Sequence, residues 1–195
     1  MPYCLKRKIY WYTPARTGSR TIAEVLEKFN FESVRNHNYY PNARKDGFFQ
    51  IWSVRNPYSR LVSLYNLKRQ PPHYEKNDFE VWLKNKLKND FLITKQDWDN
   101  LYVYKQKDKP DMIVRMENFK NDLLQVDFIK ENFNYQTNSI FGIDLETNRY
   151  SLKIENNRKF YDFYNEELVD LVYENLKHEF ELFGYNKNYI KDGTP

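Results

Sequence analysis

Three apolar runs along the chain predict the strands of the protein. Lys8 to Tyr12 reads KIYWY, Phe48 to Val54 reads FFQIWSV, and Asp111 to Met116 reads DMIVRM. Short runs rich in β-branched and aromatic residues are typical of strands. The second run is nearly all apolar, as in a strand that is buried on both faces. We therefore expect three core strands.

Apolar residues with helical spacing follow the first predicted strand. Ile22, Val25, Leu26 and Phe29 stand at positions i, i+3, i+4 and i+7, the spacing of one face of an amphipathic helix. This pattern predicts a helix that begins near Ser19, directly after a short polar loop. The chain therefore opens as strand, loop and helix.

A second helix is predicted directly after the second strand. Asn56 can cap its amino end and Pro57 suits its first position, while Leu61, Leu64 and Tyr65 carry an apolar face. Further helices are expected at 78–88, at 97–104, after the third strand through about Phe133, and at the carboxyl end. The last of these has an apolar face made by Leu168, Leu171, Val172 and Leu176. Residues 134–164 show no clear period.

Strands that alternate with helices predict an α/β fold with a central parallel sheet flanked by helices on both faces. The chain has 195 residues, no internal repeat and no low-complexity linker, so we expect a single domain over residues 1–195. Ligands of such sheets bind outside the carboxyl ends of the strands. The loops at 13–20 and 55–57 are expected at that edge.

Composition excludes several classes of protein. Apolar residues make up 41% and aromatic residues 18% of the chain, which is enough for a core despite a mean hydropathy of -0.90. No apolar run reaches the ~18 residues of a membrane span, and the first twelve residues lack the apolar stretch of a secretory signal. We expect a cytoplasmic or otherwise soluble protein with no membrane partner. The single Cys4 excludes a disulfide framework and a cysteine-based zinc site, and no metal-ligand spacing is present.

The net charge is +4, from 31 basic and 27 acidic residues. Both signs are interspersed along the chain, so this balance does not by itself indicate nucleic acid. It is compatible with a pocket for an anionic ligand.

The first polar loop runs from Thr13 to Thr21 and reads TPARTGSRT. A loop between a buried strand and a helix can bind an anion with backbone N–H groups and the positive end of the helix dipole. Gly18 permits a close backbone approach. There is no Gly-Lys-[Ser/Thr] ending, so the loop is not a Walker A motif. The alternative is an inert turn with a capping Ser19 and two solvated arginines.

The second polar segment runs from Arg55 to Ser63 and reads RNPYSRLVS. Arg55 ends a strand, and Ser63 lies two helical turns beyond the cap. An arginine fork and a hydroxyl at a helix start can hold a phosphate. The alternative is that Arg55 covers a sheet edge, Arg60 is solvated and Ser63 fills a helix.

Together the two segments resemble the sulfotransferases that use 3′-phosphoadenosine 5′-phosphosulfate (PAPS), most closely their carbohydrate and tyrosylprotein branches. Val114 to Asp122 (VRMENFKND) resembles a strand-to-helix segment of that family. Phe160 to Tyr185 resembles its C-terminal helix with the Phe-Gly-Tyr end. The likeness covers about residues 8–186, and it implies an α/β sandwich with a P-loop-like strand-loop-helix.

The resemblance implies binding roles for the two loops. The first loop would bind the 5′-phosphosulfate and the second the 3′-phosphate, leaving 3′-phosphoadenosine 5′-phosphate (PAP) as product. The first role falls on Arg16, Thr17, Gly18, Ser19, Arg20 and Thr21; the second falls on Arg55 and Ser63. Many relatives carry Lys where this chain has Arg16, so Arg16 is expected to act as a fixed positive fork. Arg20 stands where relatives usually carry Ser or Thr, and it contacts the sulfate or points to solvent.

A catalytic base must take the proton of the acceptor. Relatives usually place it some twenty residues beyond the first loop. His37 lies 21 residues after Arg16, and its ordinary pKa near 6.5 suits the task. The alternative is that Glu24 is the base, and that His37 is a surface residue.

Arg158 and Lys159 precede the last helix, where relatives close a basic segment over the nucleotide. The alternative is that these two residues form a solvated charge pair.

The sequence therefore predicts a metal-independent sulfotransferase whose partners are PAPS and a hydroxyl- or amine-bearing acceptor on a glycan, a peptide or a small metabolite. A non-catalytic nucleotide- or nucleic-acid-binding module is the alternative, together with a family member that binds the nucleotide but has lost transfer. Nucleic acid is not the partner we expect, because no binding signature accompanies the basic residues. The acceptor and the oligomeric state cannot be read from the sequence.

Overall fold

The computed structural model describes residues 2–14, 16–32, 43–68, 78–88, 109–145 and 159–189. The chain divides into two compact units. The first comprises Met1–Arg55 and Asp108–Ser151, and the second comprises Asn56–Lys107 and Leu152–Pro195. Each unit is described by itself, and the single domain over residues 1–195 stays a prediction.

The first unit contains a four-stranded sheet with the order β1-β2-β3-β4. Its strands are β1 (Tyr3–Cys4), β2 (Ile9–Tyr12), β3 (Phe49–Val54) and β4 (Met112–Arg115). β2, β3 and β4 run parallel, and they confirm the three predicted strands. β1 pairs antiparallel with β2; two residues are too few to leave a period in the sequence.

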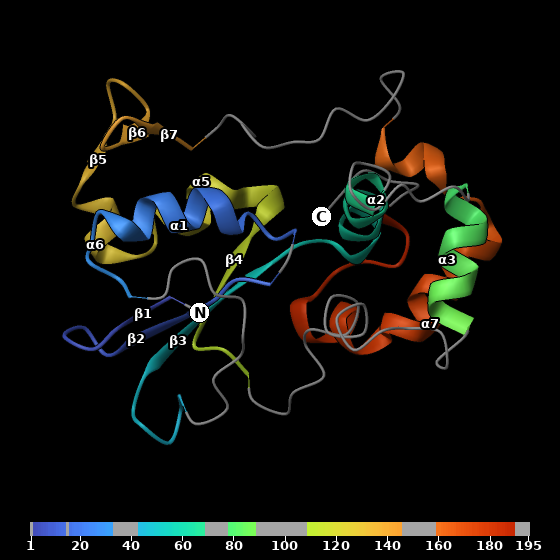
Figure 1. Cartoon of the computed structure of the whole chain (residues 1–195), viewed down its shortest axis with the longest axis horizontal. Coiled ribbons are helices and arrows are strands. Elements are labelled where there is room, and N and C mark those ends of the chain that lie inside the picture. Colours follow the sequence, from blue (N-terminus) through green and yellow to red (C-terminus); the bar gives the residue numbers. More distant parts are fainter. Residues whose placement is uncertain are drawn as a thin grey trace. The chain divides into compact units, whose positions relative to one another are not determined.

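Helices pack on this sheet through one hydrophobic core (Figure 1). The helical segments of the first unit are α1 (Ser19–Glu27), η1 (Met116–Asn118), α5 (Phe119–Leu123) and α6 (Asp127–Lys130). Trp11, Leu26, Ile51, Val114 and Leu123 are all fully buried in this core. The fold is therefore mixed α/β with a parallel sheet, as the alternating pattern predicts, and α1 begins at Ser19 as expected.

The helix predicted from the third strand through about Phe133 is wrong. The chain forms η1, α5 and the short α6 instead, with an extended residue, Val126, before α6. Val126 is buried at 6% exposure. An extended residue there turns the chain, so that Leu123 on one side and Ile129 on the other both reach the core.

The segment without a clear period begins in a small second sheet. Its strands are β5 (Phe133–Asn134), β6 (Ser139–Ile140) and β7 (Ile143–Asp144), paired antiparallel. Ile140 and Ile143 add to the same core, and β7 contacts α1. Strands of two residues carry no alternation that a sequence pattern could reveal.

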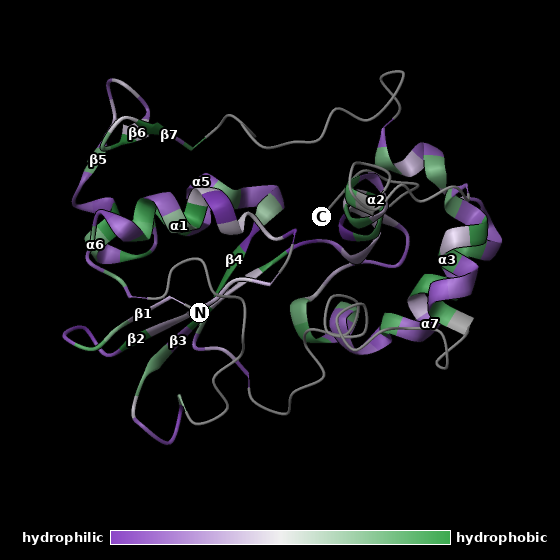
Figure 2. Cartoon of the chain, viewed as in Figure 1, coloured by the Kyte–Doolittle hydropathy of each residue, from purple (hydrophilic) through white to green (hydrophobic). Residues whose placement is uncertain are grey.

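The second unit is built from helices. Its described elements are α2 (Pro57–Lys68), α3 (Phe79–Lys88), η3 (Phe160–Phe163) and α7 (Glu166–Phe183). α7 packs against α2 and α3, and α2 also contacts η3. Figure 2 shows hydrophilic and hydrophobic residues on each of these helices, as expected when one face of each is buried. The helix expected at 97–104 lies outside the described residues.

Both ends of α7 carry residues that are typical of helix ends. The Asn165 side chain accepts a hydrogen bond from the Leu168 backbone N–H at the amino end, and Gly184 ends the helix in the left-handed conformation with φ +70°. The helix thus ends at Phe183, within the Phe-Gly-Tyr segment that carries the family likeness.

Candidate functional site

The first polar loop lies at the carboxyl edge of the parallel sheet. In the register of the sheet, Tyr12 of β2 pairs with Trp52 of β3, and Val54 of β3 pairs with Arg115 of β4. The loop after β2 and the residue after β3, Arg55, therefore leave the sheet at the same edge. This is the edge at which α/β proteins bind their ligands.

Two residues of this loop have left-handed backbones. Arg16 has φ +69° and Gly18 has φ +76°. The dihedral angle favours glycine at position 18, and a Cβ atom there would also meet Met116 Sδ and lie 2.8 Å from Met116 Cε, so the end of the Met116 side chain would have to move. Arg16 carries a Cβ atom in a conformation that side chains rarely adopt.

Thr17 closes the loop on itself. Its side chain is fully buried, and its hydroxyl donates a 2.7 Å hydrogen bond to the carbonyl oxygen of Pro14. The Thr17 hydroxyl thus fixes the shape of the loop from inside.

The loop leads directly into the first turn of α1. Gly18 is the N-cap, and no side chain caps the helix. The first backbone N–H groups of a helix have no partner within the helix, and they lie at the positive end of its dipole. Ser19 and Thr21 are half-buried in this turn and Arg20 is exposed. A capping Ser19, which belongs to the inert alternative, is not what the structure shows.

Arg16 and Arg55 meet across the edge of the sheet. Nη1 of Arg55 donates to the carbonyl oxygen of Arg16 at 3.5 Å, although the two residues lie 39 positions apart. Both side chains are half-buried. Burial, then the nearby charge of Arg55, then that of Arg20 lower the pKa of Arg16 to about 10. Arg16 is therefore charged at neutral pH in a positive environment that favours an anion.

The end of β4 is fixed by a buried carboxylate. Asp122, at 3% exposure, accepts a 2.8 Å bond from the Arg115 backbone N–H and a 2.7 Å bond from Nδ2 of Asn118. Arg115 Nη1 lies 3.8 Å from the same carboxylate. Asp122 thus holds the turn that brings Met116 beside Gly18. This role explains the spacing of seven positions between Arg115 and Asp122.

The second polar segment forms the start of α2, as predicted. The Asn56 Oδ1 atom accepts a 3.0 Å hydrogen bond from the Tyr58 backbone N–H, and Pro57 is the first helical residue. Ser63 is half-buried on this helix. Arg60 is not solvated, in contrast to the inert alternative; it is 1% exposed and paired with Glu179 of α7. No local pattern in the sequence predicts this pair, because its members are 119 residues apart.

Three site predictions remain. His37 and Arg158 are outside the described residues. Lys159 is exposed and is the N-cap of η3, with its Nζ atom 5.5 Å from the centroid of the Tyr161 ring. Their proposed roles stay predictions.

A comparison with protein families decides the class of protein. The model of the sulfotransferase family matches residues 13–186, which is most of the chain and includes every predicted site residue. The chain belongs to the sulfotransferase family. Among curated proteins and among solved structures, no match was found. Membership indicates sulfuryl transfer from a donor to an acceptor, and the cationic edge described above suits such a donor.

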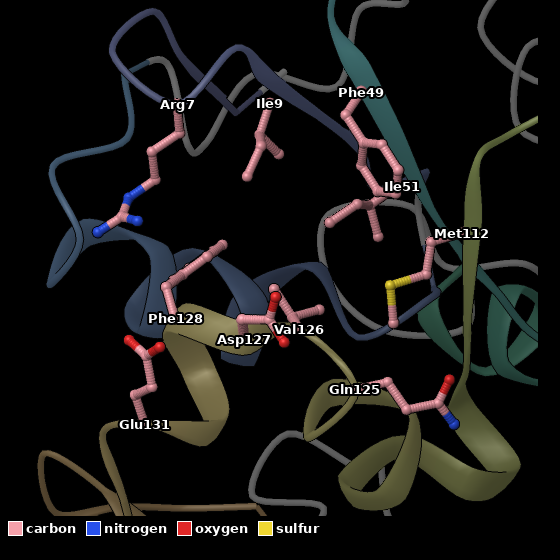
Figure 3. A pocket seen from close by; sticks show the side chains of 10 residues that line it. All are labelled: Arg7, Ile9, Phe49, Ile51, Met112, Gln125, Val126, Asp127, Phe128 and Glu131. Atoms are coloured by element: carbon pink, nitrogen blue, oxygen red, sulfur yellow. The ribbon is translucent and has the colours of Figure 1, made fainter.

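This sulfotransferase also has a cavity at the opposite end of its parallel strands. Ile9, Phe49 and Met112, the first residues of β2, β3 and β4, line this cavity of about 490 Å³ together with Asp127 and Glu131. Figure 3 shows the side chains that surround it. None of the predicted site residues lines it. Both apolar side chains and the charged Arg7, Asp127 and Glu131 line the cavity, and no pattern in the sequence predicts it.

Two kinds of feature are absent from the described part of the sulfotransferase. There, no group of three or more His, Cys, Asp or Glu side chains could hold a metal ion. Within the same residues, no helix combines the length and the apolar character that crossing a bilayer requires.

Proposed function

We propose that this sulfotransferase transfers the sulfuryl group of PAPS to an acceptor hydroxyl or amine. The observation that carries the proposal is the contact between Arg16 and Arg55. The family likeness assigns these arginines to opposite ends of one nucleotide, and the Arg55 side chain reaches the Arg16 backbone carbonyl oxygen at the edge of the sheet where α/β ligands bind.

The reaction needs positioning and charge neutralisation more than covalent chemistry by the protein. An oxygen or nitrogen of the acceptor forms a bond to sulfur, the bond from sulfur to the bridging phosphate oxygen breaks, and PAP leaves with the electron pair. Negative charge grows on that bridging oxygen. The Arg16 guanidinium and the amino end of α1 supply fixed positive charge for it.

Binding roles follow from the family likeness. We assign Arg16, Thr17, Gly18, Ser19, Arg20 and Thr21 to the 5′-phosphosulfate. Within this set the Thr17 hydroxyl and backbone N–H both donate to the Pro14 carbonyl oxygen, at 2.7 and 3.4 Å, so Thr17 acts by shaping the loop. Arg55 and Ser63 are assigned to the 3′-phosphate, and Arg158 and Lys159 to the closing segment. His37 is proposed as the base that takes the acceptor proton.

Calorimetric titration with PAP, beside 5′-AMP and ATP, tests the nucleotide site. We expect micromolar binding that requires the 3′-phosphate and disappears in Arg55→Ala, because a charge-assisted pair with a phosphate is lost. Equal binding of all three nucleotides, or none, would contradict the proposal. Transfer is then measured from radiolabelled PAPS to glycan, peptide and small-molecule acceptors.

The alternative, a nucleotide-binding member without transfer, is separated by the same assay. Wild type that binds PAP but labels no acceptor favours it. If labelling is found, it must fall in Arg16→Ala. A polynucleotide affinity that declines steeply with salt would instead favour nucleic-acid binding.

A further inference from the structure

A buried ion pair anchors the first half of α2. Nη2 of Arg60 lies 2.9 Å from Oε1 and 2.7 Å from Oε2 of Glu179 on α7, and the two side chains are 1% and 4% exposed. A buried pair of this kind contributes little net stability compared with an apolar pair of similar size. Its geometric effect is larger, since one nitrogen faces both carboxylate oxygens and fixes the position of the helix.

Two tyrosines, the buried Tyr58 and the half-buried Tyr164, hold the same turn of α2 in place. The Tyr58 hydroxyl donates to the carbonyl oxygen of Lys187 at 3.0 Å, and the Tyr164 hydroxyl donates to the carbonyl oxygen of Tyr58 at 2.9 Å. Burial raises the pKa of both phenols, so both remain protonated and able to donate. The Tyr58 and Tyr164 rings also contact each other edge to face, with centroids 5.2 Å apart.

Ser63 is the residue of α2 that this anchor affects most directly. It follows Arg60 by three positions, so the two lie on neighbouring parts of the helix surface, one turn apart. Ser63 is only half-buried, and the anchor lies between it and the cap at Asn56. A change in the position of this turn would therefore move the Ser63 hydroxyl.

We infer that the Arg60–Glu179 pair is a positioning device that places Ser63 for the 3′-phosphate of the nucleotide. The inference rests on the proposed function, because it assigns the pair a role in the site that Ser63 is proposed to form. Arg60 and Glu179 act through the helix and are themselves buried away from the solvent.

The test compares the affinity for PAP with that for 5′-AMP, which lacks the 3′-phosphate. A loss of folded protein lowers both affinities equally, whereas a displaced Ser63 lowers only the affinity for PAP. We expect the ratio of the affinity for PAP to the affinity for 5′-AMP to fall about tenfold in the double variant Arg60→Met/Glu179→Met. A fall of that size corresponds to the loss of a hydrogen bond to a charged group. Replacing both partners avoids an unpaired buried charge.

A second variant and a control complete the experiment. Glu179→Gln keeps the shape and one acceptor oxygen, and we expect a smaller fall of the ratio. Lys84→Met is the matched control, because Lys84 joins α3 to Glu167 of α7 through an exposed pair at 2.8 Å without involving α2; its ratio should equal that of wild type. Thermal unfolding of each variant shows that it is folded at the temperature of titration.

Three outcomes count against the inference in different ways. If wild type discriminates PAP from 5′-AMP and both folded variants discriminate equally well, the pair is structural only. If wild type itself does not discriminate, the 3′-phosphate site fails, and with it the proposed function. A fall of the ratio in Lys84→Met as large as in the double variant would also count against the inference.

Discussion

At the scale of single residues, Arg16 combines two unfavourable features. Its backbone is left-handed at φ +69°, and its charge lies near those of Arg55 and Arg20, which with burial lower its pKa to about 10. Backbone strain of this kind is concentrated at functional sites. The loop thus accepts a cost in folding free energy to hold a guanidinium where an anion can bind it.

Two substitutions at Arg16 separate strain from charge. Arg16→Gly and Arg16→Ala both remove the guanidinium, so both should abolish sulfuryl transfer. Glycine adopts the left-handed conformation without the Cβ penalty, so its variant should be more stable than the alanine variant by about 1 kcal/mol. Denaturant unfolding measures the difference. An alanine variant that is equally stable would show that the loop relaxes when the arginine is lost.

The lowered pKa of Arg16 also predicts stabilisation by anions. The charged form is less favourable in the folded than in the unfolded protein at every pH below about 10, and this cost diminishes as the pH rises through that value. A bound sulfate offsets the cost at neutral pH. At a concentration ten times its dissociation constant, sulfate should raise Tm by about 3 °C. Chloride at equal ionic strength should not, and Arg16→Ala should lose the effect.

His37 is expected to change the rate rather than nucleotide binding. As the base, it must be neutral, so transfer should increase as the pH rises through about 6.5. His37→Ala should lower kcat by roughly two orders of magnitude or more and leave the affinity for PAP unchanged. The pH dependence of kcat and a PAP titration check both parts. A variant with wild-type kcat would return the role to Glu24.

At the scale of elements, the sequence predicted local junctions well and distant contacts poorly. Asn56 and Pro57 predict the amino end of α2, because helix capping depends on residues that are neighbours in the sequence. The Arg60–Glu179 pair and the contact of Gly18 with Met116 depend on residues about a hundred positions apart, for which the chain carries no local signal. The break after α5 was missed because burial, and not period, makes Val126 extended.

Asp122 stabilises the junction between β4 and the helical segments that follow it. It holds the turn from β4 into η1 and α5 through the Arg115 N–H and the Asn118 amide. Asp122→Ala should cost roughly 1–3 kcal/mol of unfolding free energy, because buried polar groups lose their partner. Asp122→Asn, which retains one acceptor oxygen, should cost less. Urea unfolding of the two variants provides the comparison, and equal losses would contradict the role of the carboxylate bonds.

At the scale of the whole molecule, the sequence predicts a single domain, whereas the chain divides into two compact units. A single domain unfolds in one cooperative step, for which the calorimetric and van't Hoff enthalpies agree. For 195 residues the enthalpy should be roughly 130 kcal/mol near 60 °C. Units that fold independently would give two transitions, or a calorimetric enthalpy about twice the van't Hoff value, because each unit contains about half of the chain. Scanning calorimetry of the full chain without nucleotide makes this measurement. Agreement of the two enthalpies supports one domain, and a twofold excess would replace it with two.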